Sequence, residues 1–321
     1  MFARPERAGE SAPAGALQRD GPLRWRGVNA WHRQAAGAVL FACLSGAFVF
    51  PAELRVVGTD LLGVEFSKAL YDYAGRHDLA LALALDGSRP GLDQLKAGRA
   101  DLALLVLPPE EEPAAAAFAS ATLAYHRVIF LVPPPAPLAQ ISLDQLAGIF
   151  GVGGAASYAR WGEVGLTGDW SGSAIAPQVP AVGAGIAMEY FRQTVLHGRD
   201  LKSNVGRYDS PGDLVQRLAG DSRAIALAGA PPPKAGVAKI VPVAVRADEP
   251  AYLPTPENLH SGDYPLRLPL RVVFRHESEP AIRSLLQFLF SDELAQQLER
   301  AGVVPLPAAA RRQQALAWEP R

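Results

Sequence analysis

From Leu54 onwards, short apolar runs alternate with amphipathic stretches, and this alternation constrains the fold more than any other feature. The apolar runs are Leu54–Val57, Leu79–Leu85 and Asp101–Leu107. Between the first two, apolar residues recur every three or four positions from Leu62 to Tyr73, a spacing that predicts a helix. A second helix is expected to begin near Leu92 and to end at Gly98. Strands that alternate with helices predict an α/β fold with mostly parallel sheets and right-handed crossovers.

A stiff turn follows the next apolar strand. The run Arg127–Val132 ends at Pro133–Pro135, and such a turn suits a crossing of the chain from one lobe to another. Before this strand, the acidic run Glu110–Glu112 and the alanines behind it are expected to form a surface loop.

The part of the chain beyond the prolines has helices of its own. They are expected at Leu143–Ile149, Ile186–Leu196 and Gly212–Ala219. Ser210 is placed to cap the third of these helices, and Pro211 suits its first position. Ala224–Ala228 is expected to be a buried strand, and Ile240–Val245 to lead the chain back to the first lobe.

These patterns predict two lobes joined by two crossings. Residues 53–131 and 237–309 would form a discontinuous first lobe, residues 132–236 a continuous second lobe, and residues 310–321 a C-terminal tail. One long helix, Glu279–Arg300, is expected near the end of the first lobe.

Composition narrows the function classes. The net charge is −1 and no basic run appears, which argues against a nucleic-acid-binding surface. With 49% hydrophobic residues and balanced charge, the 321-residue chain can bury substantial cores and is not expected to be disordered over most of its length.

Residues 1–52 differ from the rest. Arg24, Arg26 and Arg33 precede an uninterrupted apolar run, Ala35–Ala52, that contains small residues at Ser45–Ala47. A positive flank, an apolar middle and small residues are typical of a secretory signal peptide behind a disordered start. The alternatives are a retained membrane anchor and lipid attachment at Cys43. We therefore expect an exported, periplasmic protein.

Cys43 is the only cysteine, so a processed chain would contain none. This excludes a cysteine nucleophile and a thiolate metal site from the mature protein. The six histidines show no metal-binding spacing, and neither a G-x-S-x-G elbow nor a Walker loop is present. The sequence predicts no enzyme, no metal and no cofactor. Trp161 and Trp170 are expected to pack in the core or on the surface.

Two motifs carry a family resemblance. The segment Pro254–Phe274 contains Asn258, Gly262 and a Tyr264-Pro265-Leu266 entry into a strand. The segments Ile141–Gly151 and Arg160–Gly165 read I-S-L-D-Q-L-A-G-I-F-G and R-W-G-E-V-G. Both resemble segments of the phosphate-type periplasmic solute-binding proteins of ABC transporters. The resemblance implies a type II periplasmic-binding-protein fold, an anion held between the lobes, and a membrane permease or sensor as partner.

In the resembled family, three strand-to-helix turns surround the anion. The first turn here is Gly58–Asp60, where Thr59 matches a family hydroxyl and Asp60 would repel phosphate unless it accepts a proton from the ligand. An ordinary helix N-cap is the alternative role for Thr59.

The second turn is Asp86–Gly91. Gly87 allows close backbone approach, Ser88 offers a hydroxyl, and Arg89 would bind an oxyanion strongly if it faces the ligand. A solvated arginine paired with Asp86 is the alternative for Arg89.

The third turn departs from the family pattern. Gly183, Ala184 and Gly185 stand where a G-S-G is expected, Ile186 replaces a threonine, and the upstream arginine is missing. Each lost hydrogen bond to a charged ligand costs about 1.5–3 kcal/mol, so we expect phosphate to bind weakly. The first functional hypothesis is an exported protein that binds a small, anionic solute. The alternative is a non-transporting envelope sensory or interaction module on the same fold.

Overall fold

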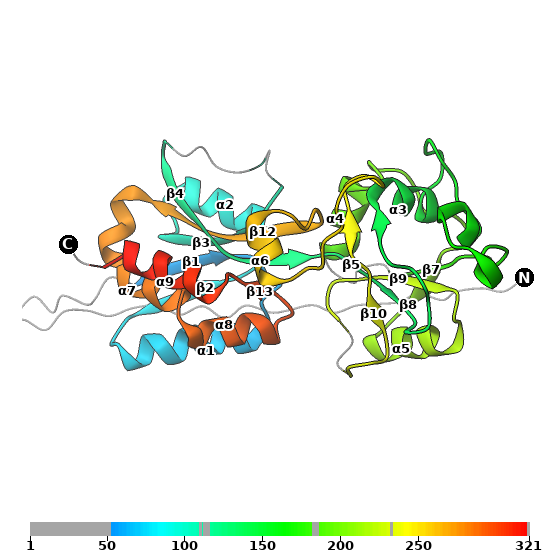
Figure 1. Cartoon of the computed structure of the whole chain (residues 1–321). Coiled ribbons are helices and arrows are strands. Elements are labelled where there is room, and N and C mark those ends of the chain that lie inside the picture. The colour runs from blue at the N-terminus through cyan, green and yellow to red at the C-terminus, as the bar shows by residue number, and fades with distance from the viewer. Residues whose placement is uncertain (1–52, 109–110, 112–115, 182–185, 232–233, 320–321) are drawn as a thin grey trace, which may run out of the picture. The chain divides into compact units, whose positions relative to one another are not determined.

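The computed structural model describes residues 53–108, 111, 116–181, 186–231 and 234–319 (Figure 1). The expected signal peptide lies outside these ranges, and so do residues 182–185, which include the predicted third turn. Within the described residues, no helix combines the length and the apolar character that crossing a membrane requires.

The first sheet has six strands in the order β13-β4-β12-β3-β1-β2. Their bounds are β1 Leu54–Gly58, β2 Leu81–Ala84, β3 Leu102–Val106, β4 Phe118–Arg127, β12 Arg267–Arg275 and β13 Val304–Pro305. β1 pairs with β2 and β3 in parallel, whereas β12 lies antiparallel between β3 and β4.

Helices cover both faces of this sheet, and the strands are apolar on both faces for that reason. The helices are α1 Gly63–Arg76, α2 Ser88–Lys96, α7 Glu279–Leu289, α8 Asp292–Arg300 and α9 Ala308–Ala317. In β1, Val56 packs in the same cluster as Phe66 of α1, while Val57 packs with Leu92 and Leu95 of α2. In Figure 1 α1 and α8 lie side by side, and Arg76 bonds Glu293 at 2.8 Å between them.

The second sheet has five strands in the order β10-β5-β9-β7-β8. Their bounds are β5 Ile129–Val132, β7 Ala176–Pro180, β8 Gly206–Tyr208, β9 Ala224–Ala228 and β10 Lys239–Ile240. The accompanying helices are α3 Leu143–Phe150, α4 Ile186–Thr194 and α5 Pro211–Gly220. A small two-stranded sheet pairs β6 Ile141–Ser142 with β11 Val243–Ala244. Three buried rings, Phe130, Phe150 and Phe191, contact one another in this part of the molecule at centroid distances of 5.5–5.8 Å.

Tyr264 fixes the point at which the chain leaves the first sheet for the second. Its ring is fully buried, and its hydroxyl donates to the carbonyl of Val128, the single residue between β4 and β5, at 2.6 Å. Val128 N–H in turn donates to Leu266 O at 3.0 Å. α6, Pro256–Ser261, ends at Gly262 with φ +97°, and Tyr264 N–H then donates to Asn258 O at 3.1 Å. The Tyr-Pro-Leu motif is therefore part of the crossing itself.

The fold class agrees with the sequence prediction, and so does the cap of α5, whereas the capping box of α3 was not predicted. Ser142 and Gln145 form a capping box, and Ser210 accepts from Asp213 N–H with Pro211 at the helix start.

Several elements differ from the prediction. β5 and β10 belong to the second sheet, so sheet membership changes at Val128 and Val241, a few residues from the expected boundaries. β4 was not expected at all. The predicted helix Glu279–Arg300 is two helices, because Ser291 caps a new helix by accepting from Leu294 N–H at 3.2 Å. The expected tail contains α9.

Candidate functional site

The first two predicted turns lie in direct contact at the carboxyl ends of β1 and β2. Gly87 N–H donates to Gly58 O at 2.7 Å. Gly58 has φ +136°, and a Cβ there would stand 2.0 Å from the carbonyl oxygen of Leu104. A Cβ on Gly91 would stand 2.7 Å from Gly58 Cα. Glycine is therefore required at Gly58 by the approach of β3 and at Gly91 by the approach of the first turn.

Thr59 is 1% exposed, and its contacts are local. Its backbone N–H donates to Leu104 O at 2.8 Å, and its Oγ1 accepts from Leu61 N–H at 3.3 Å. The alternative role as a helix N-cap is wrong, because α1 begins at Gly63 and its N-cap is Leu62. Thr59 stabilises the turn from within, whereas Asp60 beside it is exposed.

Ser88 is the first residue of α2 and joins two elements. Its Oγ accepts from the backbone N–H of Val106, at the end of β3, at 2.9 Å. Because the oxygen is used as an acceptor, the hydroxyl proton is left for donation to another group. The first N–H groups of an α-helix also lack intrahelical partners and favour an anion.

Arg89 is exposed and engaged by a carboxylate. Its Nε and Nη2 donate to Glu111 Oε2 and Oε1 at 2.8 and 2.6 Å, a bidentate pair. Its side chain is 74% exposed. The hydrogen bond from Arg89 lowers the pKa of Glu111. The expected alternative partner, Asp86, is wrong: the partner is 22 positions further along the chain. Glu111 is thus a residue of this site that sequence reasoning missed, and the acidic run 110–112 was its only signal.

Gly183, Ala184 and Gly185 lie outside the described residues. α4 begins directly after them, at Ile186. The structure therefore brings together Gly87, Ser88 and Arg89 with the turn at Thr59, and the place of the third turn stays a prediction.

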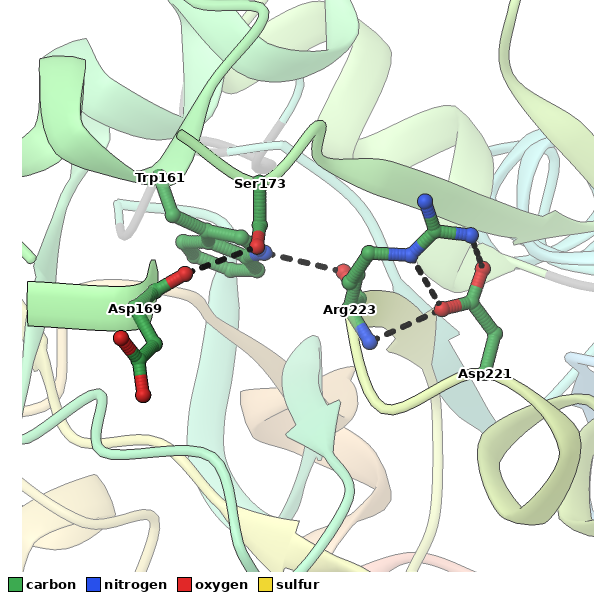
Figure 2. Close-up of polar contacts among 5 residues, drawn as sticks. All are labelled: Trp161, Asp169, Ser173, Asp221 and Arg223. Atoms are coloured by element: carbon green, nitrogen blue, oxygen red, sulfur yellow. Dashed lines mark hydrogen bonds and ion pairs between the residues drawn. The ribbon is translucent and has the colours of Figure 1, made fainter. Parts of the chain in front are cut away.

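The R-W-G-E-V-G motif of the second lobe is structural (Figure 2). Trp161 is fully buried and its Nε1 donates to the carbonyl of Arg223, just before β9, at 3.1 Å. Arg223 is held in turn by Asp221, with 2.8 and 3.0 Å bonds. Ser173 Oγ donates to the carbonyl of Asp169 at 3.3 Å. Trp161 is core, as expected, and Trp170 packs edge-on against it at 6.4 Å.

Among the described residues, no group of three or more His, Cys, Asp or Glu side chains could hold a metal ion. The most perturbed histidine, His126 on β4, has its pKa lowered to about 4 by burial and by the neighbouring Arg127.

A family model described as a PBP superfamily domain matches residues 51–293. A comparison with curated proteins finds no match. Among solved structures, the chain is similar to a possible phosphate binding protein from Planctomyces limnophilus (TM-score 0.63, 19% identity, 84% of this chain and 100% of that one). It is also similar to an ABC-type phosphate transport receptor from Vibrio cholerae (0.58, 19%, 79% and 100%) and to PstS from Borrelia burgdorferi (0.66, 16%, 79% and 98%).

At these identities the structural likeness speaks for the fold, and it confirms the two-lobed periplasmic-binding-protein architecture. The family model spans most of the chain, from just before β1 into α8. The chain belongs to the PBP superfamily.

Proposed function

We propose that this protein binds a small anionic solute, and that the turn Gly87–Arg89 supplies the main contacts. The observation that carries the proposal is the conjunction at one point of a helix N-terminus, a hydroxyl and an arginine. Ser88 begins α2, its hydroxyl keeps a donatable proton, and Arg89 presents a planar fork to the exterior.

Glu111 occupies the position that an oxyanion would take on Arg89. An anion that binds the guanidinium must displace this carboxylate or share the arginine with it. The competition, added to the missing hydroxyls of the third turn, predicts a phosphate affinity that is micromolar or weaker. Asp60 opposes binding of a dianion further. We propose no reaction for the site.

Two of the similar proteins named above, a possible phosphate binding protein and an ABC-type phosphate transport receptor, support a transport role. We propose that the chain is exported through its N-terminal segment and that two lobes close on the solute by a hinge motion. It would then present the solute to a membrane permease or sensor. The lobes follow the two sheets, with Gly183, Ala184 and Gly185 completing the site from the second lobe.

The altered third turn favours a second candidate, a non-transporting envelope module that keeps the fold and binds no phosphate. Genes for a permease and an ATPase beside this one support transport, whereas a neighbouring sensor kinase supports the second candidate. Recovery of the soluble protein from the periplasm of a Gram-negative host tests export. A full-length chain held in the inner membrane contradicts it.

A ligand screen tests binding directly. Thermal unfolding of the purified chain is measured with phosphate, sulfate, molybdate, organic anions and amino acids. A ligand at one hundred times its Kd stabilises the folded chain by about 2.7 kcal/mol. We expect an anion to give the largest stabilisation. A neutral solute that outperforms every anion, with no effect from any anion, overturns the proposal.

A further inference from the structure

A pocket of about 240 Å³ lies beside β4 and β13, at the opposite edge of the six-stranded sheet from β1 and β2, whose carboxyl ends carry the turns at Gly58 and Gly87. β4 and β13 flank it, whereas β1 and β2 carry those turns, and β12 and β3 lie between. Its walls are apolar: Ile240 and Pro254 from one part of the chain, and Val303, Val304 and Pro305 from another. The pocket is thus separate from the proposed anion site.

Arg127, the last residue of β4, lines this pocket. Its Nε is buried and has no hydrogen-bond partner among the residues that the structure describes. Burial lowers the pKa of its guanidinium. Arg127 as a whole is half-buried, so its guanidinium has lost part of its water, and at Nε no protein group replaces it within the described residues. An anion in the pocket would supply what is missing.

Glu299 limits which anion fits. It lines the same pocket but is exposed, and within the described part of the chain it forms no ion pair with Arg127. A carboxylate at the rim repels a second negative charge on a ligand. The apolar walls favour an alkyl or alicyclic body, and the volume restricts that body to a compact one.

We propose that this pocket binds a small organic monocarboxylate, whose carboxylate pairs with the guanidinium of Arg127 and whose apolar body lies against Ile240, Val303 and Pro305. The guanidinium is suited to the task because its fork matches a carboxylate in two parallel hydrogen bonds. The inference stands on the cavity and its unpaired arginine, and it does not rest on the proposed function at Ser88 and Arg89.

Calorimetry with isovalerate and cyclohexanecarboxylate tests the proposal, with isovaleramide as the uncharged analogue of the same shape. On the unmodified chain, at least one acid is expected to bind tenfold or more tightly than the amide. Phosphate at 10 mM should not displace the acid, since phosphate is expected near the other edge of the sheet. Equal binding of acid and amide, no binding of either acid at 10 mM, or displacement by phosphate overturns the proposal.

Arg127→Met locates the site. Methionine keeps an unbranched apolar stem but lacks the guanidinium and its charge, and acid binding is expected to fall at least tenfold. Arg76→Met is the matched control, because Arg76 is an exposed arginine on α1 that pairs only at the surface with Glu293. Unchanged acid binding in Arg127→Met overturns the assignment. If that variant does not fold, the acid-to-amide comparison on the unmodified chain still decides.

Discussion

Two arginines near opposite edges of the six-stranded sheet, Arg89 on α2 and Arg127 on β4, differ in how their charge is balanced. Arg89 is exposed and already paired with Glu111 through two short bonds. Arg127 is more deeply placed, and its Nε has no partner among the described residues. An anion at Arg89 must therefore compete with a carboxylate of the protein, whereas an anion at Arg127 would meet no such competitor. We therefore expect weak anion binding at Arg89, where Glu111 competes, and selective pairing with a carboxylate at Arg127.

Gly58→Ala disrupts the first turn, beside the Arg89 site, and has the largest expected effect on stability. The new Cβ would meet Leu104 O at 2.0 Å, at a residue with φ +136°. We expect a loss of more than about 4 kcal/mol in the free energy of unfolding, measured by urea denaturation. Gly63→Ala is the control, since Gly63 also has a positive φ, +72°, but nothing lies within 4 Å of its Cβ position. It should cost about 1–2 kcal/mol. Similar costs for the two variants would show that backbone strain, and not the collision with Leu104, determines the loss of stability.

His126→Leu tests the surroundings of Arg127, because the pKa of the neighbouring His126 depends on how deeply this part of β4 is buried. Its pKa of about 4 in the folded chain lies below the ordinary 6.5, so the unfolded chain binds more protons between these values. Stability from this group is complete above pH 6.5 and is lost as the pH falls towards 4. The loss amounts to about 3 kcal/mol.

Urea denaturation of both proteins at pH 7.5 and at pH 4.5 measures the difference. The unmodified chain should lose more stability than His126→Leu on acidification, since leucine does not titrate. An equal pH dependence in the two proteins would mean that His126 is solvated and that this edge of the sheet is wetter than its burial indicates.

The double variant Ala184→Ser with Ile186→Thr adds hydroxyl donors at the third turn, which we propose faces the anion at Arg89. If the third turn faces the same ligand, phosphate binding should strengthen by up to about 1.5–3 kcal/mol for each recovered bond to the charged ligand. Calorimetry with phosphate checks this, and acid binding at Arg127 is the internal control. No gain would mean that residues 183–186 do not contact the anion.

Helix starts set by neighbouring residues could be predicted from the sequence, whereas contacts between residues far apart in the chain could not. Ser210 and Pro211 could be assigned as helix-start signals, because a cap acts within four residues. The two acids that follow Ser291 are a signal for a new helix start, but this break was missed. The leucine spacing continues across it and favoured one long helix. β4 was missed because its alanines have low strand propensity, and its pairing with β12 comes from far along the chain.

The same limit applies to the sites. The glycines and Ser88 of the turns follow from their position after predicted strands, so spacing could find them. The pairing of Arg89 with Glu111 could not be found, because the two residues are 22 positions apart, with most of α2 and all of β3 between them. The pocket at Arg127 gathers residues from four separate segments, and no local pattern marks it.

Glu111→Gln removes the difference between the two arginines and has the smallest expected effect. The amide keeps the shape of the side chain but weakens its hold on Arg89, since a charge-assisted pair is replaced by a neutral one. Phosphate affinity should rise by about three- to tenfold, given the modest strength of exposed ion pairs. Stability should change by less than about 1 kcal/mol, which thermal unfolding checks.

The account rests most directly on Arg89 as the contact for the anion, and one set of titrations tests it. Phosphate binding is measured by calorimetry on the unmodified chain, on Arg89→Gln, on Glu111→Gln and on the variant that carries both of these substitutions. We predict micromolar or weaker binding to the unmodified chain, at least tenfold weaker binding to Arg89→Gln, and tighter binding to Glu111→Gln. The variant with both Arg89→Gln and Glu111→Gln should bind phosphate as weakly as Arg89→Gln alone, because Glu111 affects binding only through the arginine. A nanomolar Kd for the unmodified chain, or equal affinity with and without Arg89, would contradict the account.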